Sequence, residues 1–173
     1  MNVVSGIWHS QDLPPLNQPR MNHSSLAINN KIYVVGGGEK SIETLGMRVR
    51  EDGSISFVSR KWDSWEPKHP ITQLLPVIAP LSNGRSFLVF GSDQLDAFEG
   101  SRRGLVISTE AKKVEKMFEQ DEFICRSYGG GQLTSDGHTL ALVAGGSTPA
   151  STVMVKFDPL NNRWNTLKKF GRT

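Results

Sequence analysis

An apolar hairpin recurs three times along this 173-residue chain. Its copies occupy residues 26–37, 79–91 and 133–146. Each copy is an apolar strand, a polar two-residue turn, a second apolar strand and a closing glycine. The closing glycines are 55 and 54 residues apart, at Gly36, Gly91 and Gly145. The turns keep nearly the same interval, at Asn29-Asn30, Asn83-Gly84 and Asp136-Gly137. Because Asn and Gly accept the positive φ that a tight hairpin needs, the repeat predicts three equivalent units.

A second strand pair follows each hairpin. Residues 47–58 alternate in polarity and predict a turn at Asp52-Gly53, and residues 153–164 predict a turn between 158 and 162. Residues 105–118 are ambiguous, because the charged stretch from Glu110 to Gln120 could also form a helix. The periodic context favours two strands that turn near residues 110–112. Each unit is therefore predicted to hold four antiparallel strands.

Four-stranded units of about 50 residues are typical of β-propeller blades, which cover each other's faces by packing side by side around an axis. The uncharged strands at 32–35, 87–90 and 140–144 are the expected buried inner strands. The strands that carry Arg48, Arg50, Lys113 and Lys116 are the expected exposed outer strands. The predicted fold is all-β, with three blades and one leading outer strand.

The chain resembles the kelch-repeat family. Residues 19–37 resemble the first half of a kelch motif almost position by position, and residues 155–164 resemble the second half. The motif positions are Tyr33, Gly36, Gly37, Gly91, Gly145, Gly146, Trp8 and Trp164. The second unit departs from the pattern, since Ser92 follows Gly91 and no tryptophan stands at Val114.

The resemblance implies a segment of a kelch-type propeller. Residues 1–18 are predicted to be the last strand of a preceding blade with its linker. The three blades are predicted at residues 19–67, 68–124 and 125–173. Kelch propellers close with more than three blades, so we expect missing chain segments, a second copy or another subunit to complete the ring.

No catalytic, metal or cofactor site is predicted. The four histidines, His9, His23, His69 and His138, show no ligand spacing, although kelch-like oxidases hold copper with histidines and tyrosines. Gly129-Gly130-Gly131 lacks the Lys-Ser/Thr that follows a phosphate-binding loop. The acidic residues Asp93, Asp96 and Glu99 do not match the spacing of a calcium loop.

Three residues are predicted to bind a partner. In substrate-recruiting kelch propellers, the residue before the first strand of a blade often points to the ligand-facing end of the ring. Arg20 and Arg126 match that position, and Gln73 is the nearest counterpart in the second blade. Two guanidinium groups there could bind an acidic motif. The alternative is that these arginines satisfy loop carbonyls between blades.

The sequence therefore predicts a non-catalytic module that presents propeller-face loops to a protein partner within a larger assembly. One alternative is a sugar-acting enzyme, an isomerase or oxidase, with Arg20, Glu39, Arg126 and His23 gathered at one mouth of the ring. Another is an RNA-associated subunit, although the net charge is only +3 and the basic residues are scattered. No apolar run is long enough for a membrane helix, and the single cysteine, Cys125, favours a reducing, cytoplasmic compartment.

Overall fold

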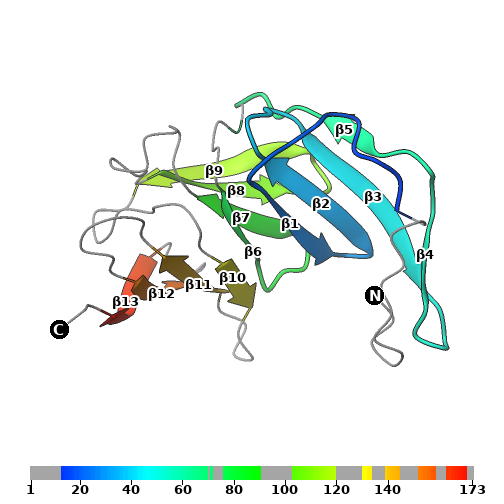
Figure 1. Ribbon diagram of the computed structural model, residues 1–173. Helices are drawn as coiled ribbons and strands as arrows, with labels where there is room; N and C mark the ends of the chain where they lie inside the picture. Colours follow the sequence, from blue (N-terminus) through cyan, green and yellow to red (C-terminus); the bar gives the residue numbers. More distant parts are fainter. Residues whose placement is uncertain are drawn as a thin grey trace.

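The computed structural model describes residues 13–69, 71, 76–90 and 103–119, and four further strands at 130–133, 139–144, 152–158 and 163–170. Every regular element in this part of the chain is a β-strand, and the strands form three antiparallel sheets (Figure 1). The all-β, antiparallel prediction is confirmed. Within the described residues there is no helix that could cross a lipid bilayer.

The first sheet has the strand order β1-β2-β3-β4, with β5 also paired to β3. Its strands are β1 (His23–Ile28), β2 (Lys31–Gly36), β3 (Ile42–Val49), β4 (Ile55–Phe57) and β5 (Asp63–Trp65). Ile28 pairs with Lys31, so the loop between β1 and β2 has the two residues predicted. Asn29 and Asn30 have φ of 53° and 56°, the left-handed backbone that a two-residue hairpin turn requires.

The outer strand of the first sheet is split, which differs from the prediction of four strands. Met47 to Val49 pair with β4, whereas Ile42 to Thr44 pair with β5. Between the two ladders the Val58 amide donates to the Gly46 carbonyl at 2.9 Å. A Cβ on Gly46 would lie 3.3 Å from the Val58 side chain, so the missing side chain lets the chain cross here and resume as β5.

The second sheet has the order β6-β7-β8-β9. Its strands are β6 (Val77–Pro80), β7 (Ser86–Phe90), β8 (Arg103–Ser108) and β9 (Lys113–Glu119). The ambiguous stretch therefore forms two strands, as the repeat favoured. The predicted two-residue turn at Asn83-Gly84 is wrong. Leu81 donates to the Ser86 carbonyl and leaves a four-residue loop, in which the Asn83 side-chain oxygen accepts two backbone N–H bonds.

The third sheet has the order β10-β11-β12-β13. Its strands are β10 (Gly130–Leu133), β11 (Thr139–Ala144), β12 (Thr152–Asp158) and β13 (Arg163–Phe170). The predicted turns at 136–137 and 158–162 lie largely outside the described residues. The three sheets fall within residues 23–65, 77–119 and 130–170, and β6 neighbours β10 at the boundary between the second and third sheets.

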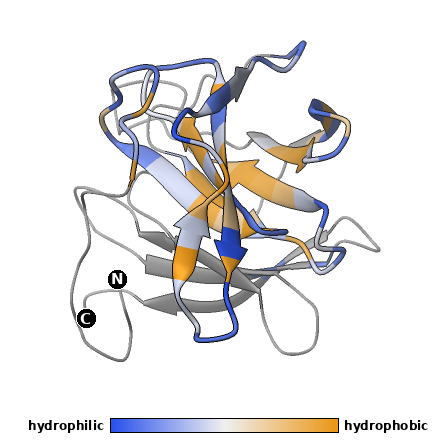
Figure 2. Ribbon diagram, turned by 90° about the vertical axis from the view of Figure 1, so that its right-hand side faces the viewer, coloured by the Kyte–Doolittle hydropathy of each residue, from blue (hydrophilic) through white to orange (hydrophobic). Residues whose placement is uncertain are grey.

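The main core lies between the first two sheets. Tyr33 and Val35 on β2 pack in one buried cluster with Phe87 and Val89 on β7, and the Tyr33 and Phe87 rings are 5.5 Å apart. The alternate residue of β7, Leu88, is also fully buried, so this strand is covered on both faces. Figure 2 shows hydrophobic residues concentrated on the central strands and hydrophilic residues on the loops. This arrangement is that of adjacent propeller blades.

The two faces of the first sheet are covered differently. We call the face that packs on the second sheet the front face, and the opposite one the back face. On the back face Val34, Leu45 and Trp62 form a smaller core, against which Leu16 packs. The segment 13–20 thus covers part of the back face. The other part of the back face, at the β3–β4 hairpin, carries exposed apolar side chains.

Candidate functional site

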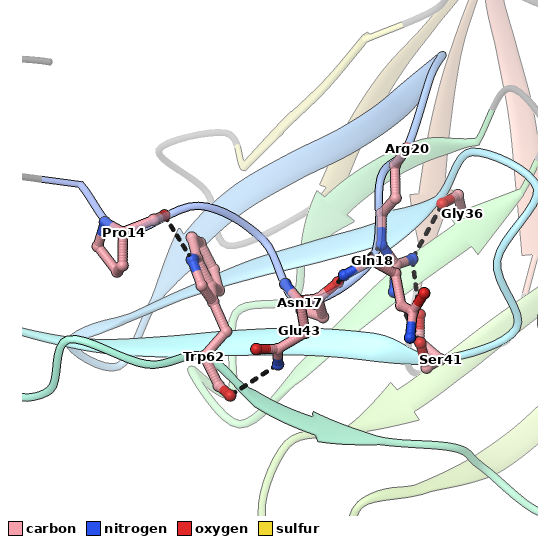
Figure 3. Close-up of polar contacts among 8 residues, drawn as sticks. All are labelled: Pro14, Asn17, Gln18, Arg20, Gly36, Ser41, Glu43 and Trp62. Atoms are coloured by element: carbon pink, nitrogen blue, oxygen red, sulfur yellow. Dashed lines mark hydrogen bonds and ion pairs between the residues drawn. The ribbon is translucent and has the colours of Figure 1, made fainter.

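Arg20 lies at the end of segment 13–20, three residues before β1. Its side chain is 0% exposed, and its Nε donates to Glu43 at 3.1 Å (Figure 3). One terminal nitrogen donates to the Gly36 and Ser41 carbonyls at 3.0 and 2.8 Å, and the other donates to the Ser41 hydroxyl at 2.7 Å. All three guanidinium nitrogens are therefore bound within the first sheet and its loops.

Glu43 is the other half of this buried pair. It lies on β3, and its side chain is also 0% exposed. One carboxylate oxygen accepts the backbone N–H of Asn17 at 2.6 Å, and the other accepts that of Gln18 at 3.2 Å besides the Arg20 bond. Burying a charge is costly unless it is paired and hydrogen-bonded, and both conditions are met. The pair fastens segment 13–20 to the back face.

Trp62 makes a second attachment for the same segment. Its indole N–H donates to the Pro14 carbonyl at 2.9 Å, and its own carbonyl accepts from the Asn17 side chain at 2.8 Å. Figure 3 shows these contacts in a row along the segment, from Pro14 to Arg20. We call Arg20, Glu43, Trp62 and the backbone they hold the latch.

Gly37 allows the loop before β1 to lie close to the end of β2. Its φ is +79°, and an added Cβ would lie 2.7 Å from the Met21 carbonyl oxygen and 3.2 Å from the Arg20 Cβ. A side chain here would therefore displace the loop that delivers Arg20. The preceding glycine, Gly36, supplies one of the carbonyls that the guanidinium binds.

Tyr33 joins the first two sheets through a polar contact as well as through its ring. The side chain is 2% exposed, and its hydroxyl is hydrogen-bonded to the side chain of Thr109, which follows β8 in the second sheet. Thr109 also donates to the Arg85 carbonyl at 2.7 Å. Burial raises the pKa of Tyr33 above its ordinary value, and the hydrogen bond between the Tyr33 and Thr109 side chains partly opposes this.

The structure places Arg20 in a different role from the predicted partner contact. Its side chain has no exposed surface, and it binds carbonyls of its own sheet and loops, whereas the structural alternative predicts loop carbonyls between blades. Gln73 and Arg126 lie outside the described residues, as do Trp8, Gly91, Gly145 and Gly146. Trp164 lies on β13, paired with Phe157.

The sugar-acting alternative requires Arg20, Glu39, Arg126 and His23 at one mouth of the ring, and Arg126 lies outside the described residues. Arg20 binds Glu43 on the back face, and not Glu39 or His23. In the described ranges no group of three or more His, Cys, Asp or Glu side chains could hold a metal ion.

Sequence reasoning missed Glu43, Ser41, Trp62 and Thr109 as structural partners. Glu43 did carry a signal. It faces Val34 in the ladder of the first sheet, and the corresponding position facing Val89 in the second sheet is Leu105. A carboxylate at an inward position that is apolar in the neighbouring repeat indicates a buried charge partner.

A family model described as the kelch motif matches residues 19–44, which span β1, β2 and the beginning of β3. This chain contains a kelch repeat. The matched segment includes Arg20, Tyr33, Gly36, Gly37 and Glu43, so the ion pair of the latch and the inter-sheet tyrosine lie within the kelch motif, whereas Trp62 lies outside it.

The chain is also similar to curated and solved proteins. It is 25% identical to "Putative protein tag-53" of Caenorhabditis elegans over 98% of its own length, and it spans 14% of that relative. A fungal alcohol oxidase of the AA5 family, in complex with copper, matches 89% of the chain at a TM-score of 0.52 and 15% identity. The chain covers 31% of that structure. A putative 6-phosphogluconolactonase of Bacteroides uniformis matches 86% of the chain at a TM-score of 0.48 and 10% identity. The oxidase likeness supports the fold alone.

Proposed function

We propose that the chain is a non-catalytic interaction module, whose blades present loops to a protein partner and whose first sheet packs on a further blade in a larger assembly. The kelch motif supports an interaction module in general terms. The observation that carries the assembly is the uncovered part of the back face. Val49 and Ile55 pair across β3 and β4, and they are 58% and 54% exposed.

The exposed pair continues an apolar row. Met47 and Phe57 are the next cross-strand pair on the same face of the sheet, and both are half-buried. Phe57 packs against the smaller core that the latch covers. The corresponding face of the second sheet is sealed by the first sheet, where Phe87 and Val89 have no exposed surface. A further sheet of the same kind is therefore the partner that suits this face, and for the isolated chain a second copy supplies it.

The experiment exchanges Val49 and Ile55 for lysine together. We expect the unmodified chain to run above its monomer mass in light scattering at micromolar concentration, and the V49K/I55K chain to run as a monomer. Met117→Lys is the matched control, because Met117 is also an exposed apolar side chain but lies on β9 of the second sheet. A monomeric unmodified chain, or equal loss of association in the control, would contradict the assembly.

The loop-binding part of the proposal depends on Arg126 and Gln73, because Arg20 is buried. An acidic peptide is the partner that the arginine chemistry favours. Arg126→Glu should weaken binding of such a partner and leave the fold intact. Arg20→Glu should unfold the first sheet instead, since it would place a second carboxylate beside Glu43. Unchanged binding by Arg126→Glu would remove the acidic-motif proposal.

A further inference from the structure

Asn22 is the first residue of a short sequence pattern that the fold does not explain. It is followed by His23 and Ser24, and it is the only asparagine of the chain with Ser or Thr two residues later. Asn-X-Ser with X other than proline is the acceptor pattern for N-linked glycans. We propose that Asn22 is an N-glycosylation site, and that it carries an oligosaccharide at the start of β1.

The structure presents the Asn22 side chain to solvent. The residue lies in the short loop between the latch and β1, it is exposed, and its φ is 58°. Among the described residues no hydrogen bond engages its amide. By contrast, the amides of Asn17 and Asn83 bind Trp62 and Ser86. A bulky hydrophilic group on Asn22 would therefore extend outward without breaking a hydrogen bond within the described part of the chain.

Two other asparagines show that the backbone conformation alone does not explain the pattern. Asn29 and Asn30 are also exposed and also have positive φ, because they form the hairpin turn. Neither is followed by a hydroxyl residue at the required position. They provide internal comparisons that should stay unmodified.

The transfer is a substitution at carbon. The Nδ2 of Asn22 forms a bond to C1 of the first sugar of a polyprenyl-diphosphate-linked oligosaccharide. The bond from C1 to the diphosphate oxygen breaks, the amide loses one proton, and the polyprenyl diphosphate leaves. In the folded chain the Ser24 hydroxyl donates to the Pro76 carbonyl, and Ser24 is half-buried on β1. The transfer must therefore precede the contact of β1 with Pro76, the residue directly before β6 of the second sheet.

This inference is independent of the proposed function, and it has a consequence for the compartment. Glycan transfer requires synthesis into the secretory pathway, whereas the single cysteine favoured a reducing compartment. A chain with one cysteine forms no internal disulfide in either compartment, so the cysteine count alone does not decide between them. Detecting a glycan on Asn22 decides between them. The oligosaccharide would lie in the short loop between Arg20 and the first residue of β1, His23.

The test uses the protein isolated from its natural source. Treatment with peptide N-glycosidase in ¹⁸O-labelled water converts a glycosylated asparagine to labelled aspartate, which mass spectrometry locates. We expect complete labelling loss for Asn22→Gly, which keeps the positive φ and removes the amide. Ser24→Thr keeps the hydroxyl and should retain the label, and the neighbouring Ser25→Ala should retain it too. An unlabelled Asn22 in the natural protein, or a glycan that persists in Asn22→Gly, would overturn the proposal.

Discussion

Removing the Glu43 charge should destabilise the chain far more than removing an exposed charge of the same type. In Glu43→Gln the guanidinium of Arg20 loses its anionic partner but stays in a site with no exposed surface. Loss of one member of a buried pair costs about 3–5 kcal/mol, because the remaining charge is left uncompensated. The two backbone N–H groups at Asn17 and Gln18 would also face an amide that can accept at only one atom.

The chain contains a matched control for this substitution. Arg85 and Glu110 form an ion pair at 3.5 Å, and their side chains are 68% and 61% exposed. Exposed pairs contribute about 0–1 kcal/mol, because water and salt screen them. Glu110→Gln should therefore change the free energy of unfolding by less than about 1 kcal/mol.

Urea denaturation followed by tryptophan fluorescence measures both variants, since Trp65 lies on β5 and Trp62 packs on the back face of the first sheet. The account predicts a difference of at least about 2 kcal/mol between the two glutamine variants. The double variant Arg20→Met/Glu43→Leu removes the uncompensated charge but should recover only part of the loss, because the Gly36 and Ser41 carbonyls then lose the Arg20 donor. If Glu43→Gln and Glu110→Gln fall within about 1 kcal/mol of each other, the latch is not sealed from water and the reasoning fails.

Two further predictions concern the kelch-motif residues. Gly37→Ala should destabilise the chain by about 1–3 kcal/mol more than Gly84→Ala, because both have positive φ but only the Gly37 Cβ would meet a neighbour, the Met21 carbonyl; equal midpoints in urea would contradict the close approach. Tyr33→Phe should cost about 1 kcal/mol at neutral pH by removing the bond to Thr109. Burial raises the pKa of Tyr33 in the folded state above its ordinary value of 10.0. The contribution of the neutral tyrosine to the free energy of unfolding is therefore complete below pH 10.0, and it is lost as the pH rises from there through the pKa of the folded state. The alkaline loss of stability should therefore be smaller in Tyr33→Phe, and identical alkaline profiles would exclude this role.

The repeat in the sequence was sufficient to predict the described inner strands and the turns at residues 29–30, 52–53 and 110–112. Positive φ at Asn29 and Asn30 and at Gly53 lies where the turn residues indicated. The period of the repeat also decided between helix and strands for residues 105–118, which local charge pattern alone left open. These features are local or periodic, so a single sequence contains them.

The latch could not be predicted in the same way, because it depends on contacts across the chain. Glu43 meets donors 23 to 26 residues away, and Trp62 meets a carbonyl 48 residues away. The position of Arg20 before the first strand made it a candidate for partner binding. It did not indicate that the guanidinium turns inward, since that direction depends on the carboxylate supplied by β3.

The most direct test of the account is a double-mutant cycle between Tyr33 and Phe87. These residues are far apart in sequence and belong to different sheets, and their rings lie 5.5 Å apart only if the sheets pack face to face as blades. Tyr33→Leu, Phe87→Leu and the double variant are compared by urea unfolding. The account predicts a coupling free energy of about 0.5–1.5 kcal/mol. Additive effects, with no coupling, would contradict the packing of the first two sheets on which the interpretation depends.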